Sequence, residues 1–419
     1  MNILLITDDF YPNFGGVANV LWNLYKFIQN KEHKLLIFNP YTKCENVYKQ
    51  VIKKNYELRD LAYFLQKKEF LFYVINSFWH VIRDKRTPFS HRLKIIMFLI
   101  LKPKILMKVI ENVSNLLPYL KKLDFDIIVG GNSGWIFSLV FILSRFFDKK
   151  LISLAYGTDF LIRNPLSLKT FYFRNTDKII VINNEMKQLI KNMHQLDENQ
   201  LEIINVGLDL KELEVKESKK ELRDEFNISE KQFVLISVGR HVPRKKFDLV
   251  IKAVSEIKKL KPSLDIKYFL IGEGQETLYL KKLTKQLNLE NQIEFLGSCD
   301  FEKRNKFYKL SDIFLMPVEP KKNNIEGFGI VFLEANYYKV PVIGTATGGI
   351  IAAIEDGETG LFIKPNDLND LVEKILYLYE NENLRRQMGE KGHNRVNNEF
   401  SWLKIVDDYI RVFKNTYFK

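Results

Sequence analysis

The stretch FVLISVGRHVPRKKFDLVIKAVSEIKK (residues 233–259) contains a strand, a loop and a helix in succession. Residues 233–238 form a short apolar run with β-branched side chains, which predicts a buried strand. The run ends at Gly239, and residues 248–259 show the apolar spacing of a helix. Strand–helix units of this kind build parallel sheets with helices on both faces.

The same unit recurs in both halves of the chain. In the first half, apolar runs predict strands at residues 3–7, 34–38, 127–129, 151–155 and 178–182. In the second half, they predict strands at residues 233–238, 267–271, 293–296, 313–316 and 340–343. Two complete series in 419 residues predict an α/β protein with two Rossmann-like, doubly wound parallel-sheet domains.

A charged segment at residues 211–230 separates the two series and is typical of a linker followed by a surface helix. We therefore expect an N-terminal domain at residues 1–206 and a second domain at residues 207–399. The first domain contains a stretch without a clear strand, residues 51–122, whose aromatic and basic residues predict a helical insertion. Such helices either lie in the interface of an anionic membrane or pack as ordinary helices with a solvated basic face.

The net charge of +13 favours an anionic partner, although a lysine-rich solvated surface explains it equally well. Nucleic acid is not an expected partner, because no nucleic-acid motif is present and the basic stretch is rich in apolar residues. Cys44 and Cys299 fit no metal-ligand spacing and indicate reduced thiols. No secretory leader and no run of ~20 apolar residues is evident, so we expect a cytoplasmic protein, at the inner face of the membrane if the insertion binds lipid.

Open α/β sheets bind ligands beyond the carboxyl ends of their strands. After the first expected strand, the loop that contains Asn13, Gly15 and Gly16 leads into a helix. Two glycines at a helix start allow a phosphate to approach the backbone, whereas the simpler interpretation is a tight turn. The loop lacks the GxGxxG pattern of dinucleotide enzymes, which argues against NAD.

The loop after the strand at residues 233–238 contains Gly239, Arg240 and Lys245. The two cations can neutralise a diphosphate, Arg by paired hydrogen bonds and Lys as a point charge. The alternative is a solvated basic loop. Glycine-rich turns also follow the next two strands, at Gly272, Gly274 and Gly297, where a nucleotide can approach the backbone.

The segment EGFGIVFLE (residues 326–334) carries two carboxylates on either side of an expected helix start. Gly327 and Gly329 are poor helix-interior residues, so the helix should begin near Gly329. Glu326 then lies in the preceding loop and Glu334 about one turn inside the helix. Each carboxylate can accept hydrogen bonds from ligand hydroxyls, while the free amides at the helix start favour phosphate.

Together these motifs resemble the family-4 retaining glycosyltransferases of the GT-B architecture, the glycosyl transferases group 1, over nearly the whole chain. The matching motifs, in chain order, are Gly15-Gly16, Gly239-Arg240 with Lys245, Gly272-Glu273-Gly274, Phe295-Leu296-Gly297, Ser311-Asp312, Glu326 with Glu334, Gly348-Gly349, Glu355-Asp356-Gly357, Thr359-Gly360 and Phe400-Ser401-Trp402. The resemblance implies two domains that face each other across a cleft. It also implies a C-terminal helix, residues 400–419, that crosses back to the first domain.

The resemblance further implies roles for individual residues. Arg240 and Lys245 would hold the diphosphate of the donor, and Glu334 would bind its ribose. Glu326 would bind hydroxyls of the donor sugar. Gly16 would border donor and acceptor. Backbone amides would come from Phe328, Gly329 and Ile330. No metal and no cofactor besides the nucleoside-diphosphate-sugar is expected, because no acidic cluster for a metal is evident and the two cations would replace it.

The chain departs from the family pattern at residues 155–159, Ala-Tyr-Gly-Thr-Asp. Tyr156 stands where the family commonly has histidine, and a tyrosine cannot carry a positive charge near neutral pH. Asp159 keeps its place and is expected to contact the sugar or the acceptor. We place Tyr156 and Asn13 on the acceptor side, and interpret Asn183 as structural.

The expected activity is transfer of a hexose-type sugar, with retention, to a saccharide or lipid-linked saccharide in cell-surface glycan synthesis such as that of lipopolysaccharide. The alternative is a nucleotide-sugar-binding protein of the same fold without transferase activity. The intact set of Arg240, Lys245, Glu326 and Glu334 favours the enzyme.

Overall fold

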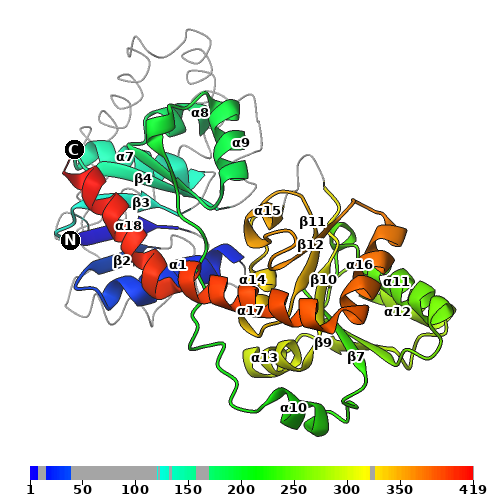
Figure 1. The fold of residues 1–419 in the computed structure, drawn as a ribbon. Coiled ribbons are helices and arrows are strands. Elements are labelled where there is room, and N and C mark those ends of the chain that lie inside the picture. Colours follow the sequence, from blue (N-terminus) through cyan, green and yellow to red (C-terminus); the bar gives the residue numbers. More distant parts are fainter. Residues whose placement is uncertain are drawn as a thin grey trace, which may run out of the picture. The chain divides into compact units, whose positions relative to one another are not determined.

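A computed structural model of the chain describes residues 1–7, 16–38, 120, 123–131, 135–156, 169–320 and 326–418. They form two compact units, the first comprising Met1–Ile204 with Val406–Lys419 and the second Asn205–Ile405 (Figure 1). Each unit contains one six-stranded sheet. All strand pairs are parallel, so the predicted α/β class with two doubly wound sheets is confirmed. Apart from Leu120, the predicted insertion lies outside the described residues.

The sheet of the first unit has the strand order β2-β1-β3-β4-β5-β6. Its strands are β1 (Asn2–Ile6), β2 (Lys34–Phe38), β3 (Ile127–Gly130), β4 (Lys150–Ala155), β5 (Lys178–Val181) and β6 (Leu201–Ile203). The described helices of this unit include α1 (Gly16–Gln29), α7 (Trp135–Phe146), α8 (Lys169–Arg174) and α9 (Asn184–His194). The helix α9 begins as expected for a structural Asn183, whose side chain accepts a hydrogen bond from the amide of Met186 at 2.7 Å.

The helix α18 (Trp402–Tyr417) begins in the second unit, and from Val406 onward its residues belong to the first. Tyr409 and Phe413 of this helix are fully buried. The Tyr409 hydroxyl hydrogen-bonds the hydroxyl of Tyr156, which follows β4. The final turns of α18 are therefore part of the core of the first unit.

The sheet of the second unit has the strand order β12-β11-β10-β7-β8-β9. Its strands are β7 (Phe233–Val238), β8 (Ile266–Ile271), β9 (Ile293–Gly297), β10 (Ile313–Met316), β11 (Val342–Thr345) and β12 (Gly360–Ile363). The chain moves outward from β7 through β8 to β9, and then returns to β10 on the other side of β7. This reversal makes the carboxyl ends of β7 and β10 the switch point at which such sheets bind ligands.

Two details of the second sheet differ from the sequence-based expectation. The strand predicted at residues 340–343 begins at Val342, because Pro341 has no amide hydrogen for the ladder. The short strand β12 was not predicted, since it opens with Gly360. A Cβ atom at this glycine would lie 2.3 Å from the carbonyl oxygen of Val342, so the close pairing of β11 and β12 needs glycine here.

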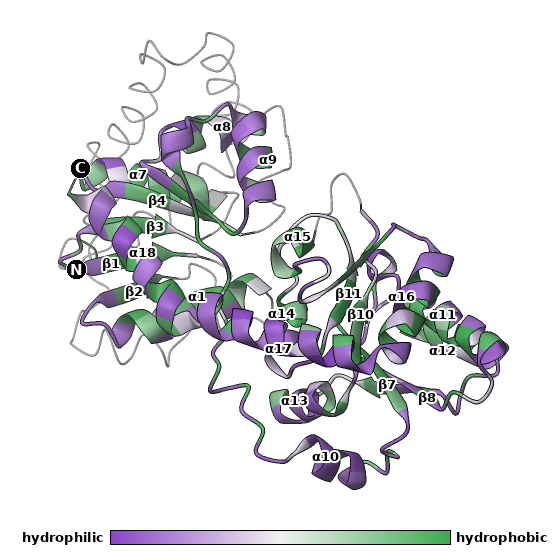
Figure 2. Ribbon diagram, viewed as in Figure 1, coloured by the Kyte–Doolittle hydropathy of each residue, from purple (hydrophilic) through white to green (hydrophobic). Residues whose placement is uncertain are grey.

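Helices cover both faces of the second sheet. On one face α11 (Phe247–Leu260) packs against α12 (Thr277–Gln286) and α16 (Leu368–Glu380). On the other, α14 (Ile330–Tyr337) packs against α13 (Phe301–Leu310) and α17 (Glu382–Glu399), as Figure 1 shows. The strands are mainly hydrophobic and α17 mainly hydrophilic (Figure 2), as expected for a sheet buried on both faces. No described helix is long and apolar enough to span a bilayer.

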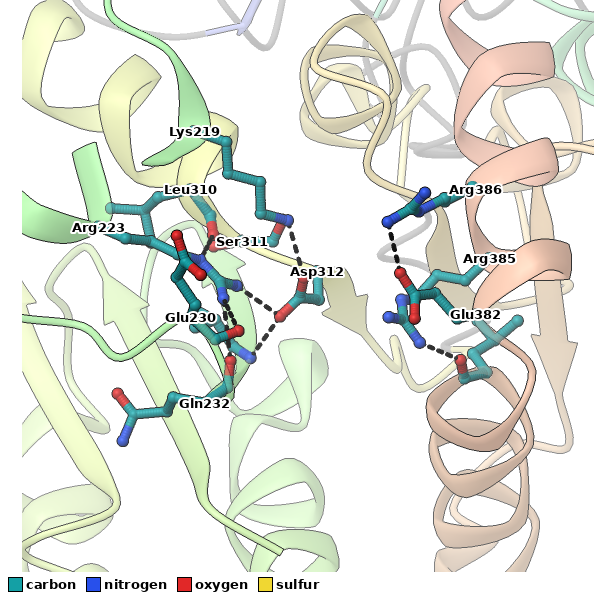
Figure 3. A network of polar contacts seen from close by, with 12 residues as sticks. Lys219, Arg223, Glu230, Gln232, Leu310, Ser311, Asp312, Glu382, Arg385 and Arg386 are labelled. Carbon is teal, nitrogen blue, oxygen red and sulfur yellow. Dashed lines mark hydrogen bonds and ion pairs between the residues drawn. The ribbon is translucent and has the colours of Figure 1, made fainter. Parts of the chain in front are cut away.

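A polar network anchors the short helix α10 (Lys219–Glu225) to the amino-terminal edge of this sheet (Figure 3). Asp312, directly before β10, accepts hydrogen bonds from Lys219 and Arg223, each at 2.7 Å, and from the amide of Val234 at 2.8 Å. Burial on its own raises the pKa of the Asp312 carboxyl, but Lys219 and Arg223 outweigh it and hold that pKa below its usual value. The network lies at the edge opposite the switch point and is structural.

Candidate active site

The loop that follows β7 carries the cations predicted for the site. Residues 243–245 form one 3₁₀ turn, and Lys246 then adopts a left-handed conformation with φ of 54° before α11 begins. This turn directs the Lys245 side chain toward the end of β10, where its Nζ lies 3.0 Å from the Sδ of Met316. Lys245 therefore reaches across the switch point from β7 to β10.

Glu326 meets this loop from the segment before α14. Its carboxylate oxygen Oε2 lies 3.0 Å from the Nζ of Lys245, and the guanidinium of Arg244 pairs with the same oxygen. The side chains of Glu326 and Arg244 are each 14% exposed and that of Lys245 is 9% exposed. The structure thus brings together Glu326 and Lys245, two residues that the sequence analysis assigned to one site.

Arg244 is the member of this cluster that the sequence analysis did not assign. Its only signal in the sequence is its position next to Lys245 in a tight turn. The contact with Glu326 spans 82 positions of the chain, so local spacing does not reveal it.

Burial and charge pairing act in opposite directions on this cluster. Burial alone raises the pKa of the Glu326 carboxyl, but Lys245 and Arg244 reverse this effect and hold that pKa below its usual value. For Lys245, burial lowers the pKa of the ammonium, and the nearby Glu326 opposes this effect only in part. The carboxylate form of Glu326 is therefore strongly favoured.

Arg240 leaves the end of β7 on the same loop. Its side chain is exposed, and no hydrogen bond or ion pair connects it to another residue in the part of the chain that the structure describes. Its charge contributes to the lowered pKa of Lys245, after burial and the charge of Arg244. Arg240 is thus available for an incoming anion.

The glycines after β8 serve the contact between two loops. A Cβ atom at Gly272 would lie 2.1 Å from the carbonyl oxygen of Gly239, and one at Gly274 would lie 2.4 Å from that of His241. Gly297, after β9, has a φ of 66° and would place a Cβ atom 3.2 Å from the Glu273 carboxylate. These glycines let the loops that follow β7, β8 and β9 pack closely, so their presence does not require a ligand.

His241 fastens the loop after β7 to the start of α12. Its Nδ1 lies 2.9 Å from the Thr277 hydroxyl, its amide donates to the carbonyl of Glu273, and its carbonyl accepts from the amide of Glu276. Burial, with a smaller contribution from Lys281, lowers the pKa of the imidazole to about 4. His241, the residue after Arg240, is therefore neutral at physiological pH and acts as a structural link between the loop after β7 and the start of α12.

The start of α14 lies at the same carboxyl edge. Gly329 caps the helix in a left-handed conformation with φ of 79°, and Ile330 is the first helical residue, which confirms the predicted helix start. The amide of Phe332 donates to the carbonyl of Gly329, and the amides that precede it in the first turn are oriented toward the helix start. The ring of Phe328 is buried against that of Phe400, so Phe328 can offer only its backbone.

Glu334 lies one turn inside α14 and is 6% exposed. Its Oε1 lies 3.1 Å from an Nη of Arg304, and its Oε2 accepts a hydrogen bond of 2.9 Å from the hydroxyl of Tyr308. Both partners come from α13. They were not assigned from the sequence, because they lie 30 and 26 positions from Glu334 on another helix.

In the first unit, the residues assigned to the donor or acceptor side are only partly described. Gly16 begins α1, and among the described residues no atom lies within 4 Å of the place that a Cβ atom would take. Asn13, Gly15 and Asp159 lie outside the described residues. Tyr156 is 5% exposed, and burial, with its bond to Tyr409, raises the pKa of its hydroxyl well above the usual range. Contact of Tyr156 with an acceptor stays a prediction, and the hydroxyl is already engaged.

The described residues contain no group of three or more His, Cys, Asp or Glu arranged to hold a metal ion. The chemistry that the second unit offers is instead a cationic loop, a paired carboxylate and a helix start at one edge of a parallel sheet. This combination suits a ligand with phosphate groups next to hydroxyl groups.

Comparison with known proteins agrees with this chemistry. Residues 218–395 match the family of glycosyl transferases group 1. The chain is 29% identical over 266 residues to the N-acetyl-alpha-D-glucosaminyl L-malate synthase of Bacillus anthracis. This alignment covers 63% of this chain and 67% of that protein. The chain is also 28% identical over 421 aligned positions to an uncharacterized glycosyltransferase of Methanocaldococcus jannaschii. That alignment covers 98% of this chain and 97% of the other protein.

The fold has a counterpart among solved structures. HepE of Anabaena, solved in complex with UDP, superposes with a TM-score of 0.68 at 16% identity and covers 99% of this chain and 100% of that one. At this identity the similarity supports the fold alone. The match of residues 218–395, the relatives and the fold together support a group 1 glycosyltransferase of the GT-B architecture.

Proposed function

We propose that this glycosyltransferase takes its sugar from a nucleoside-diphosphate-sugar, and that the loop after β7 holds the diphosphate. The charge balance of the second-unit site supports this proposal. Arg240, Arg244 and Lys245 provide three cationic groups against the single carboxylate of Glu326, an excess of two (3 − 1 = 2). A diphosphate that bridges a nucleoside and a sugar carries two negative charges, so it would neutralise the site.

The single observation that carries the proposal is the contact of Glu326 with Lys245 at the switch point of the sheet. In the proposed complex, Lys245 and Arg240 stabilise the charge that develops on the leaving diphosphate, with the amides of Gly329 and Ile330 beside them. Glu326 accepts hydrogen bonds from hydroxyls of the sugar. Such fixed groups need no reorganisation during the reaction, and bond cleavage passes through an oxocarbenium-like state.

The finer assignments rest on the family resemblance. We propose a hexose-type sugar, retention of the anomeric configuration with attack assisted by the leaving phosphate, and no requirement for a metal ion. Asp159 is proposed to contact the sugar or the acceptor. A saccharide or lipid-linked saccharide of cell-surface glycan synthesis is the proposed acceptor class, supported by the basic and aromatic composition of residues 51–122.

A donor screen tests the central proposal. The full chain is incubated with UDP-, GDP-, ADP- and dTDP-linked hexoses with and without EDTA, and thermal stabilisation and nucleotide release are measured. We expect one nucleotide to stabilise the protein and its sugar conjugate to be cleaved at an equal rate in EDTA. If no donor stabilises the protein at millimolar concentration, the diphosphate site is wrong. Stabilisation without any cleavage or transfer would instead indicate a binding protein.

Membrane contact is tested separately by flotation with vesicles. The protein should float with vesicles that contain anionic lipid, and neutralising Arg92, Lys94, Lys102 and Lys104 should weaken this binding. Equal recovery of the native and the neutralised protein with the vesicles would contradict a role of these charges.

A further inference from the structure

The carboxylate of Glu334 is held on both of its oxygens. Arg304 binds Oε1 at 3.1 Å, and the Tyr308 hydroxyl donates to Oε2 at 2.9 Å. A carboxylate that is 6% exposed and held at two points has one orientation. Since each oxygen has two acceptor sites, one site on each remains for hydrogen bonds from a ligand.

Arg304 is itself fixed in place. It lies in the first turn of α13, its side chain is 18% exposed, and its guanidinium carbon lies 4.8 Å from the centre of the Phe301 ring. Burial alone lowers the pKa of this guanidinium, but Glu334 and neighbouring groups outweigh burial and raise that pKa above its usual value. Arg304 therefore stays charged. Its Nε is buried without a hydrogen-bond partner among the described residues, so the guanidinium is not fully satisfied by the protein.

The two helices present this pair at the ligand-binding edge of the sheet. The helix α13 follows β9 and α14 follows β10, so both begin at the carboxyl ends of parallel strands. Arg304 and Glu334 each lie within about the first turn and a half of their helix. The pair therefore lies near the same edge as the cationic loop after β7.

We propose that Arg304, with Tyr308, is a positioning residue that fixes Glu334 so that both carboxylate oxygens accept from the vicinal hydroxyls of a ribose, which makes the site selective for ribonucleotides over 2′-deoxyribonucleotides. This inference rests on the proposed donor site. A vicinal diol offers two O–H donors, and a carboxylate with a fixed plane accepts both. Loss of one hydroxyl leaves a buried charged acceptor with an unused site, which is costly in a site built for two hydrogen bonds.

The competing interpretation is that Arg304 only connects α13 to α14. In that case its removal lowers stability and weakens all nucleotides equally. The ratio of ribose to deoxyribose affinity separates the two interpretations, because partial unfolding or general loss of binding does not change this ratio.

The experiment uses the full chain and calorimetric titration with UDP, GDP, ADP and CDP and with the 2′-deoxy form of each. For the native protein we expect the best ribonucleotide to bind about 10- to 100-fold more tightly than its deoxy form. In Arg304→Leu this preference should fall below about threefold, Arg304→Lys should restore part of it, and Tyr308→Phe should lower it less. The matched control is Arg386→Leu, which breaks an exposed arginine–glutamate pair with Glu382 on α17.

Each outcome distinguishes the inference from the proposed function. Binding of a ribonucleoside diphosphate with full ribose preference in Arg304→Leu overturns the inference and leaves the donor site intact. Equal affinity of the native protein for ribo- and deoxyribonucleotides overturns it as well. If the native protein binds none of these eight nucleotides but binds dTDP, the inference is wrong and the proposed donor site stands. If it does not bind dTDP either, both are wrong.

Discussion

The Lys245→Met substitution removes one positive charge from the proposed diphosphate site and keeps nearly the same side-chain volume. The side chain is 9% exposed and already touches Met316, so a methionine can occupy its place. Glu326 retains its pair with Arg244 in this variant. Because no carboxylate is left without a partner, we expect the free energy of unfolding to fall by less than ~2 kcal/mol.

The effect on turnover should be much larger than the effect on stability. Two unit charges about 4 Å apart interact by about 4 kcal/mol at an effective dielectric constant of about 20. Removal of a single charge-stabilising donor in other enzymes costs about 2.7–4 kcal/mol. At about 1.36 kcal/mol for each factor of ten, we expect kcat to fall by about 10²- to 10³-fold.

The assay is nucleotide release from the best donor of the screen, together with urea unfolding of the same preparations. Lys259→Met is the matched control, since Lys259 is 66% exposed and pairs with Glu256 on the outer face of α11. A kcat of Lys245→Met within about threefold of the native value would refute the assignment of Lys245. A similar loss in the control, or a loss that follows the unfolded fraction, would refute the electrostatic reasoning.

Three further substitutions test other parts of the structure. Glu326→Gln removes the carboxylate that competes with phosphate for the cationic loop, so affinity for the free nucleoside diphosphate should rise about tenfold while transfer falls. Asp312→Asn should destabilise the second unit by about 3 kcal/mol in urea unfolding, since Arg223 loses a buried partner. The lowered pKa of Asp312 means that its contribution is present above the unfolded pKa near 4 and is lost as pH falls through the still lower folded value. Tyr156→Phe should cost about 1 kcal/mol by removing the buried hydrogen bond between the Tyr156 and Tyr409 hydroxyls, without change in nucleotide affinity.

The outcomes that contradict these expectations are specific to each substitution. Unchanged or weaker binding of the free nucleotide by Glu326→Gln would contradict the competition between carboxylate and phosphate. For Asp312→Asn, the control is Asp367→Asn, whose carboxylate caps α16 by accepting a hydrogen bond from the amide of Asp370 rather than joining two elements of the core. An equal loss of stability in both variants would contradict a special role of the network. A weakened nucleotide affinity in Tyr156→Phe would indicate that this tyrosine affects the donor site after all.

The parts of the fold that follow from local patterns were predictable from the sequence. Long apolar runs such as residues 233–238 identified the central strands, and Gly329 identified the start of α14. The three-residue strand β6 and the glycine-led β12 were missed, since their residues carry too little apolar pattern and acquire their pairing from neighbouring strands. The shift at β11 followed from Pro341, which the apolar pattern alone does not register.

The site was predictable where function places residues on the loops that follow strands, and not where it depends on contacts between distant segments. Lys245 and Glu326 were assigned from their loops, but their mutual contact and the participation of Arg244 appear only in three dimensions. The same holds for the pair of Arg304 and Glu334. Gly272 and Gly274 differ, since the close approach of two backbones already requires glycine there, and their contact with a donor stays a prediction.

The division of the chain has a consequence for the order in which the two units can fold during synthesis. The second unit is one continuous segment, Asn205–Ile405, inserted into the first, which needs Val406–Lys419 to complete its core around Tyr409 and Phe413. At about 5–20 residues per second, the ribosome needs roughly 10–40 s to add residues 205–419 after the N-terminal segment. The unit that is begun first is therefore finished last, and during this interval its core remains open to chaperones and to aggregation.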